Sequence, residues 1–277
     1  MEFFANVLRI MDWQMETPQL FGWFHLLWLA ISIAFGVGLC IWHRKGGDDR
    51  RVRRVVFGVA ITVIILEIYK MINYSFSYEN GIVFDFQWYA FPWQFCSTPM
   101  YVGLLAGIIR KGKVHDALCA YLATFAVFAG AAVMVYPGDV FVGTIGINIQ
   151  TMICHGSMIS VGIYLLYTGY VKLEHKTILK ALPVFACTLL IAVILNEIAY
   201  YSGLLETETF NMFFVSRHLD STLPVYSLVH NAVPFPFNLL IYIAGFTAAA
   251  YLMLVIAMGI RALGRKLLRS KPVPQAV

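Results

Sequence analysis

Charged residues are scarce in this chain of 277 amino acids. Only 13% of the residues are Asp, Glu, Lys or Arg, while 60% are hydrophobic. A soluble domain has about 25% charged and about 45–50% apolar residues, so the shortage of charge argues against an ordinary soluble domain. The net charge of +5 does not indicate a nucleic-acid partner, because the basic residues are confined to particular loops, as described below.

The chain also lacks cysteine pairs, a secretory leader and internal repeats. Its five cysteines include no Cys-x-x-Cys pair, which argues against a disulfide framework or a zinc site, and we expect no metal or organic cofactor. No basic stretch precedes the apolar part of the N-terminal segment, which carries Glu2, Asp12 and Glu16, so we expect no cleaved signal peptide. The absence of a repeat disfavours transporter folds built from inverted repeats.

What the chain has instead is a series of long apolar runs, with a mean hydropathy of +0.74. A helix needs about 20 residues to cross about 30 Å of hydrocarbon, which is the length of these runs. Because the runs are continuous rather than alternating, they indicate helices and not a β-barrel. We predict an all-α polytopic membrane protein with seven transmembrane helices, at about 20–42, 55–74, 92–109, 117–135, 147–171, 179–201 and 235–262.

The distribution of basic residues predicts the orientation of these helices. All Lys and Arg residues except Arg9, Lys70 and Arg217 fall after spans one, three, five and seven. By the positive-inside rule, the N-terminus lies outside and the C-terminus is cytoplasmic. We therefore divide the chain into an amphipathic segment (1–19), a seven-helix domain (20–262) with a long, packed outer loop (202–234), and a basic cytoplasmic tail (263–277).

With the orientation set, helical rise gives each polar residue an approximate depth. Cys96 falls roughly 6 Å and His155 roughly 12 Å below the outer surface. The outer half of the bundle also receives the polar residues His25, Glu67, Lys70, Gln94, Asn196 and Glu197, and the inner half almost no ionisable group. This asymmetry predicts a water-accessible pocket open toward the outer leaflet, because intramembrane charges must be paired or wet.

Several of these residues also have purely structural interpretations. Glu67 and Lys70, three residues apart, can simply neutralise each other. Asn196 and Glu197 can bond neighbouring helices, and we favour an interfacial or structural role for His25 over a catalytic one.

Cys96 and His155 suggest nucleophilic chemistry if they meet. A histidine can activate a cysteine thiol, and an amide or hydroxyl donor beside it can stabilise the oxyanion of an acyl transfer. Gln94 and Ser97 are the nearby donors. Ser97 or Thr98 can replace Cys96 as the nucleophile, because the rotation of the helix is not fixed by the sequence. A buried cysteine is equally compatible with a small apolar packing residue.

The same residues carry a family resemblance. Gln94-Phe95-Cys96, His155-Gly156, the Asn-Met-Phe-Phe segment 211–214, the Pro-Phe-Pro-Phe segment 234–237 and the opening Phe21-Gly22-x-x-His25-Leu26 resemble the YwaF family of bacterial seven-span proteins. That family is similar to a eukaryotic multi-pass acyltransferase of the TMEM type that makes polyunsaturated ether phospholipids. The resemblance implies Cys96 as nucleophile and His155 as base. A more distant likeness to hydrolases of fatty-acid esters, which use threonine with histidine, keeps Thr98 as an alternative.

We therefore expect a lipid acyltransferase or lipid ester hydrolase in a bacterial cell membrane, with membrane lipids as acyl donor and acceptor. Two other classes remain open. A small-molecule transporter would use Glu67, Lys70 and Glu197 as its pathway, and would need polar residues through the inner half of the membrane. A ligand-binding membrane protein without catalysis would hold its ligand under the loop 202–234.

Overall fold

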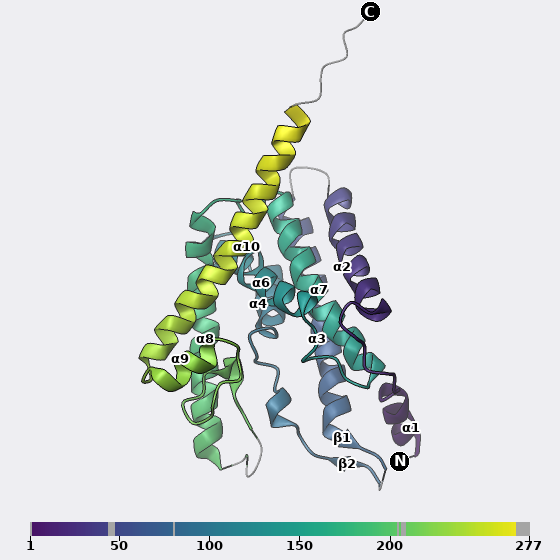
Figure 1. Cartoon of the computed structure of the whole chain (residues 1–277). Coiled ribbons are helices and arrows are strands. Elements are labelled where there is room, and N and C mark those ends of the chain that lie inside the picture. Colours follow the sequence, from purple (N-terminus) through teal and green to yellow (C-terminus); the bar gives the residue numbers. More distant parts are fainter. Residues whose placement is uncertain (1, 44–47, 80, 204, 206–208, 270–277) are drawn as a thin grey trace, which may run out of the picture.

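A helical bundle forms the body of the molecule (Figure 1). The computed structural model describes residues 2–43, 48–79, 81–203, 205 and 209–269. In this part of the chain, six helical stretches are long and apolar enough to cross a membrane, as expected of an integral membrane protein. They are α2 (Trp23–Trp42), α3 (Asp49–Ser75), α5 with α6 (Lys113–Leu122 and Phe125–Val135), α7 (Ile145–Tyr167), α8 (Lys176–Ser202) and α10 (Phe237–Arg269).

The predicted third span differs from a membrane-crossing helix. Its only regular element is α4 (Thr98–Ile108), whose 11 residues extend about 16 Å, roughly half the hydrocarbon thickness. The preceding residues 91–97 form turns. Proline explains the late start, because Pro92 has no N–H to donate to a helix and Pro99 lies in the first helical turn, where a missing N–H is tolerated.

The smaller elements are α1 (Glu2–Met11), the antiparallel pair β1 (Phe76–Ser77) and β2 (Val83–Phe84), the 3₁₀ turns η1 (Trp88–Ala90) and η2 (Met212–Phe214), and α9 (Tyr226–Ala232). Figure 1 shows α1, the β pair and α9 at the end of the bundle opposite the C-terminal end of α10. Helix α10 continues into the predicted tail as far as Arg269, and residues 270–277 of that tail lie outside the described residues.

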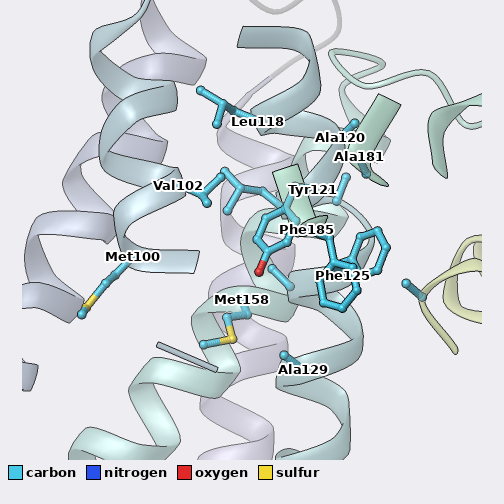
Figure 2. Packing of buried hydrophobic residues seen from close by; sticks show 14 of the residues in the cluster. Met100, Val102, Leu118, Ala120, Tyr121, Phe125, Ala129, Met158, Ala181 and Phe185 are labelled. Carbon is cyan, nitrogen blue, oxygen red and sulfur yellow. The ribbon is translucent and has the colours of Figure 1, made fainter. Parts of the chain in front are cut away.

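An aromatic core joins α5, α6, α8 and α10. The rings of Phe125 and Phe185 stack with centroids 4.4 Å apart, and those of Tyr242 and Phe246 stack at 4.1 Å. Figure 2 shows Phe125 and Phe185 side by side, with Tyr121 next to them. Lipid tails are as apolar as these side chains, so close van der Waals packing is what holds such helices together in a membrane.

Helix α7 is the central helix of the bundle, with α2 on one side and α6 on another. Two glycines permit this packing. A Cβ at Gly130 of α6 would lie 2.5 Å from the carbonyl oxygen of His155, and a Cβ at Gly156 of α7 would overlap the side chain of Ser32 on α2. The close neighbour that Gly156 admits is therefore α2.

Candidate functional site

Cys96 lies in a turn immediately before α4. The amides of Ser97 and Thr98 donate to the carbonyl of Gln94 at 2.8 and 3.1 Å, which closes the turn. Ser97 is the N-cap residue of α4, and its side chain lies beside the thiol of Cys96. Cys96 is half-buried, whereas Ser97 and Thr98 are buried. The thiol thus lies on irregular backbone that packs against the rest of the bundle.

Thr98 is engaged away from the thiol. Its hydroxyl donates to the carbonyl of Phe95 at 3.0 Å and lies 2.7 Å from the hydroxyl of Tyr121 on α5. The Tyr121 hydroxyl is also bonded to the side chain of Thr188 on α8. This chain of hydroxyls ties α4 to α5 and α8, and it leaves Cys96 and Ser97 as the groups of the turn that are free to react.

A hydrogen bond to the backbone fixes the tautomer of His155. Its Nδ1 lies 2.7 Å from the carbonyl oxygen of Thr151, and because a carbonyl can only accept, Nδ1 carries the hydrogen. In the neutral ring the lone pair then resides on Nε2. That atom is buried and has no hydrogen-bond partner among the described residues. A lone pair held in this way is the arrangement that a general base requires.

A buried polar network lies next to this histidine. Glu67 and Lys70 of α3 form an ion pair, as their spacing suggested, and Gln150 of α7 donates to the other carboxylate oxygen of Glu67 at 3.0 Å. Both partners are largely buried, with 6% and 17% of their side-chain surfaces exposed. Lys70 lies within electrostatic range of both the Cys96 thiol and the His155 ring.

The structure also brings α7 close to the turn before α4. Cys154, the neighbour of His155 in α7, lies within electrostatic range of Cys96. From α10, the hydroxyl of Tyr242 lies within the same range of Cys96, and it has no partner among the described residues. These interactions place Cys154 and Tyr242 near Cys96, but among the described residues none joins Cys96 to His155 itself.

An apolar cavity of about 260 Å³ opens between α3 and α4 next to this network. Its wall includes Glu67, Pro92 and Met100, and the β pair contributes Phe76 and Phe84. Met100 also lines a smaller inner cavity that reaches Cys154. An acyl chain that enters between α3 and α4 would thus approach the turn that carries Cys96.

Gln94 and Asn196 anchor the outer loop. The Gln94 amide donates to the carbonyl of Asn211 at 3.0 Å and accepts from the N–H of Phe213 at 2.9 Å. The Asn196 amide donates to the carbonyl of Met212 at 3.0 Å and accepts from its N–H at 2.7 Å. Both amides are therefore used by the loop backbone. Gln94 uses its oxygen and one of its two amide hydrogens on the loop, and Asn196 bonds the loop rather than another helix.

Two more predicted residues have contacts that hold the fold. Glu197 forms an ion pair with Arg217 at 2.8 Å and approaches His218 at 3.3 Å, which fastens the outer loop to α8. His25 is fully buried. Its Nδ1 accepts from the N–H of Phe21 at 3.0 Å, so its Nε2 donates to the carbonyl of Met134 at 2.9 Å. Neither ring nitrogen is available for catalysis.

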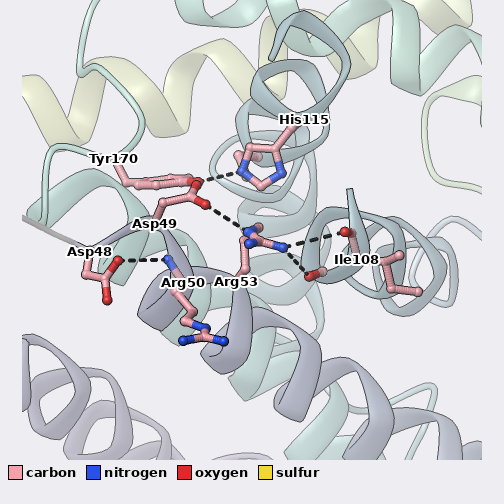
Figure 3. Close-up of polar contacts among 9 residues, drawn as sticks. Asp48, Asp49, Arg50, Arg53, Ile108, His115 and Tyr170 are labelled. Atoms are coloured by element: carbon pink, nitrogen blue, oxygen red, sulfur yellow. Dashed lines mark hydrogen bonds and ion pairs between the residues drawn. The ribbon is translucent and has the colours of Figure 1, made fainter. Parts of the chain in front are cut away.

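A second polar cluster, partly buried, which the sequence did not reveal, lies at the opposite end of the bundle (Figure 3). The hydroxyl of Tyr170 donates to Asp49 at 2.5 Å, so Nε2 of His115 donates to the Tyr170 oxygen at 2.6 Å. Arg53 pairs with Asp49 at 2.9 Å and also bonds the carbonyl of Ile108. The cluster joins α3, α4, α5 and the α7–α8 connection, so we assign it to the fold. The spacing of these residues in the sequence carried no signal.

A family model, that of the TMEM164 family, matches residues 20–258. No curated protein and no solved structure matches the chain.

Proposed function

The chain belongs to the TMEM164 family, and from this premise we propose that it is a membrane-embedded lipid acyltransferase or lipid ester hydrolase. Cys96 would be the nucleophile and His155 the base. The observation that carries the proposal is the unpartnered, buried Nε2 of His155, whose lone pair is fixed by the bond from Nδ1 to Thr151. A buried imidazole nitrogen without a partner is uncommon in folded proteins and calls for an explanation.

The reaction would proceed in two steps. Nε2 of His155 accepts the proton of the Cys96 thiol while the sulfur attacks an acyl ester carbonyl. The carbon–oxygen ester bond then breaks, His155 returns the proton to the departing alcohol, and a thioester remains on Cys96. In the second step, an acceptor alcohol or water gives its proton to His155 and takes the acyl group, and the thiol is restored.

The developing oxyanion needs donors that are not already in use. The side chain of Ser97 lies beside the thiol, and the Tyr242 hydroxyl has no partner among the described residues. Both are candidates, and Gln94 keeps one amide hydrogen beyond the one that bonds Asn211. Lys70, which is within range of the sulfur, would stabilise negative charge there.

The proposal includes a topology. The turns of residues 91–97 together with α4 would complete a third crossing, which gives seven crossings with the N-terminus outside and the C-terminus cytoplasmic. Basic residues at the ends of α2, α7 and α10 support this orientation. The reaction centre would then face the outer leaflet of a bacterial cell membrane. The cavity between α3 and α4 would receive the acyl chain sideways from the lipid.

The test uses the purified full chain in lipid nanodiscs that contain a phospholipid with a labelled acyl group and a lysophospholipid acceptor. We expect labelled diacyl product with the acceptor present, or labelled fatty acid from hydrolysis, and a labelled thioester on Cys96 that hydroxylamine removes. Cys96→Ser and His155→Gln should lower the rate by at least about 100-fold, a typical contribution of such a base.

Cys187→Ala is the matched control, because Cys187 is exposed on α8. It should retain the full rate. Activity that survives in both Cys96→Ser and His155→Gln would refute the proposed pair. Absence of both turnover and thioester in the unaltered protein would refute the proposed function.

A further inference from the structure

Helices α2 and α3 follow each other in the sequence but scarcely contact each other. Each packs on α7 instead, and α3 also packs on α4. A cavity of about 480 Å³ lies between them, lined by side chains of α2, α3 and α7. We call it the α2–α3 groove. In a bilayer a gap of this kind is filled by lipid, because neither water nor vacuum is stable against apolar walls.

The walls of the groove suit a single hydrocarbon chain. Trp28 and Phe35 of α2 face Val55 and Val59 of α3 across it, and Gly156 of α7 lies at its base. Gly58 of α3 also lines the groove. The space beside it is open, because a Cβ at this position would meet no described atom within 4 Å.

The length of the groove matches one leaflet. Along α3 it extends from Arg54 to Val63, nine residues that rise about 14 Å. Half of the hydrocarbon core is about 15 Å. The apolar run of α3 begins directly after Arg54, so the groove runs from the membrane surface at the α2–α3 connection to about the midplane.

A cation without a partner stands at the mouth of the groove. Arg54 is exposed and forms no ion pair or hydrogen bond with any described residue, whereas Arg53 pairs with Asp49. Arg50, one turn away, is also exposed. Basic side chains at a membrane surface attract anionic lipid headgroups by about 1 kcal/mol each, and arginine binds phosphate especially well.

We infer that the α2–α3 groove is a binding site for an anionic phospholipid of the leaflet at the α2–α3 connection. One acyl chain lies between α2 and α3, and the phosphate binds Arg54. The site is separate from Cys96, which does not line it, and the inference does not depend on the proposed catalysis. Its inner end shares Val63 and Ser157 with the small cavity beside Cys154, so an occupant also supports the helix packing around the reaction centre.

Native mass spectrometry of the full chain in detergent tests the site, with dioleoyl phosphatidylglycerol, dioleoyl phosphatidylcholine and oleic acid as probes. We expect one retained phosphatidylglycerol. Gly58→Leu should weaken its binding at least tenfold by filling the groove, and Arg54→Gln roughly fivefold, about the effect of one basic residue at a membrane surface. The matched controls are Gly245→Leu, whose Cβ also meets no described atom within 4 Å, and Arg265→Gln, an exposed arginine of α10 that lies outside the groove lining.

If all four variants retained phosphatidylglycerol equally, the bound lipid would be non-specific and the inference would be overturned. Tighter binding of oleic acid than of phosphatidylglycerol would also overturn it in favour of a fatty-acid site. Crosslinking in the unaltered protein avoids any effect of a variant on folding. Phosphatidylglycerol with a diazirine at the end of one chain should label the peptides that contain Trp28 or Gly156, and labelling confined to α8 and α10 would contradict the site.

Discussion

The two hydrogen bonds between the Asn196 side chain and the backbone of Met212 predict how Asn196→Leu changes the stability of the outer loop. The amide makes two hydrogen bonds to Met212, and both residues are buried, with 2% and 0% exposure. Leucine has a similar volume, but it leaves the N–H of Met212 without a partner, while the C=O keeps only the 3.4 Å bond from the N–H of Val215. An unsatisfied buried group costs about 1–3 kcal/mol, so the loop should lose at least about 1 kcal/mol of local stability.

Hydrogen–deuterium exchange measures this loss directly. Opening of the segment around residues 209–216 should become at least about fivefold more frequent, since about 1 kcal/mol corresponds to that factor, while α7 keeps its protection. Asn231→Leu is the control, because Asn231 is exposed and its side chain contacts His230 rather than the bundle. Unchanged exchange of residues 209–216 in Asn196→Leu would show that these hydrogen bonds do not stabilise the loop. Equal acceleration in both variants would indicate a general effect of leucine.

Three further predictions concern helix packing and the two polar clusters, each read from thermal unfolding in detergent. Gly130→Ala places a Cβ 2.5 Å from a carbonyl oxygen of α7 and should destabilise the protein by about 1–3 kcal/mol, whereas Gly245→Ala, with no described atom within 4 Å, should not. Lys70→Met leaves the carboxylate of Glu67 buried without its cation and should cost about 3–5 kcal/mol; adding Glu67→Gln should restore most of the loss, and no restoration would refute the pairing. Burial and the bond to a carboxylate raise the pKa of Tyr170, so its contribution is present below about pH 10 and is lost as the pH rises above that value. Tyr170→Phe should therefore be less stable at neutral pH and lose less than the unaltered protein above pH 10, and parallel pH profiles would contradict this.

Composition and hydropathy alone predicted most of the helical architecture. Long apolar runs at α2, α3, α7, α8 and α10 have no stable alternative to helix in a bilayer, because every backbone polar group must be satisfied within its own segment. The sequence also predicted the ion pair of Glu67 and Lys70, since side chains three residues apart lie on the same face of a helix.

Hydropathy predicted a complete third membrane-crossing helix, which the structure does not show, because an average over the run does not register where proline interrupts a helix. The residues around Cys96 are apolar enough for a span, yet Pro92 and Pro99 delay the helix, and the thiol emerges from a turn. Hydropathy also could not show that Gln94 and Asn196 hold the loop backbone. Those bonds join residues 117 and 16 positions apart, and no local rule predicts them.

The sequence by itself determined that this protein is a bundle of membrane helices and which polar groups those helices carry, because long apolar runs have no stable alternative to helix in a bilayer. Only the tertiary structure decided which of those groups have hydrogen-bond or ion-pair partners within the bundle and which do not. His25, Gln94, Asn196 and Glu197 find partners on distant segments, whereas Nε2 of His155 finds none among the described residues. Whether a polar atom is satisfied depends on the position and direction of atoms brought together from several helices, and that information exists only once the chain has packed.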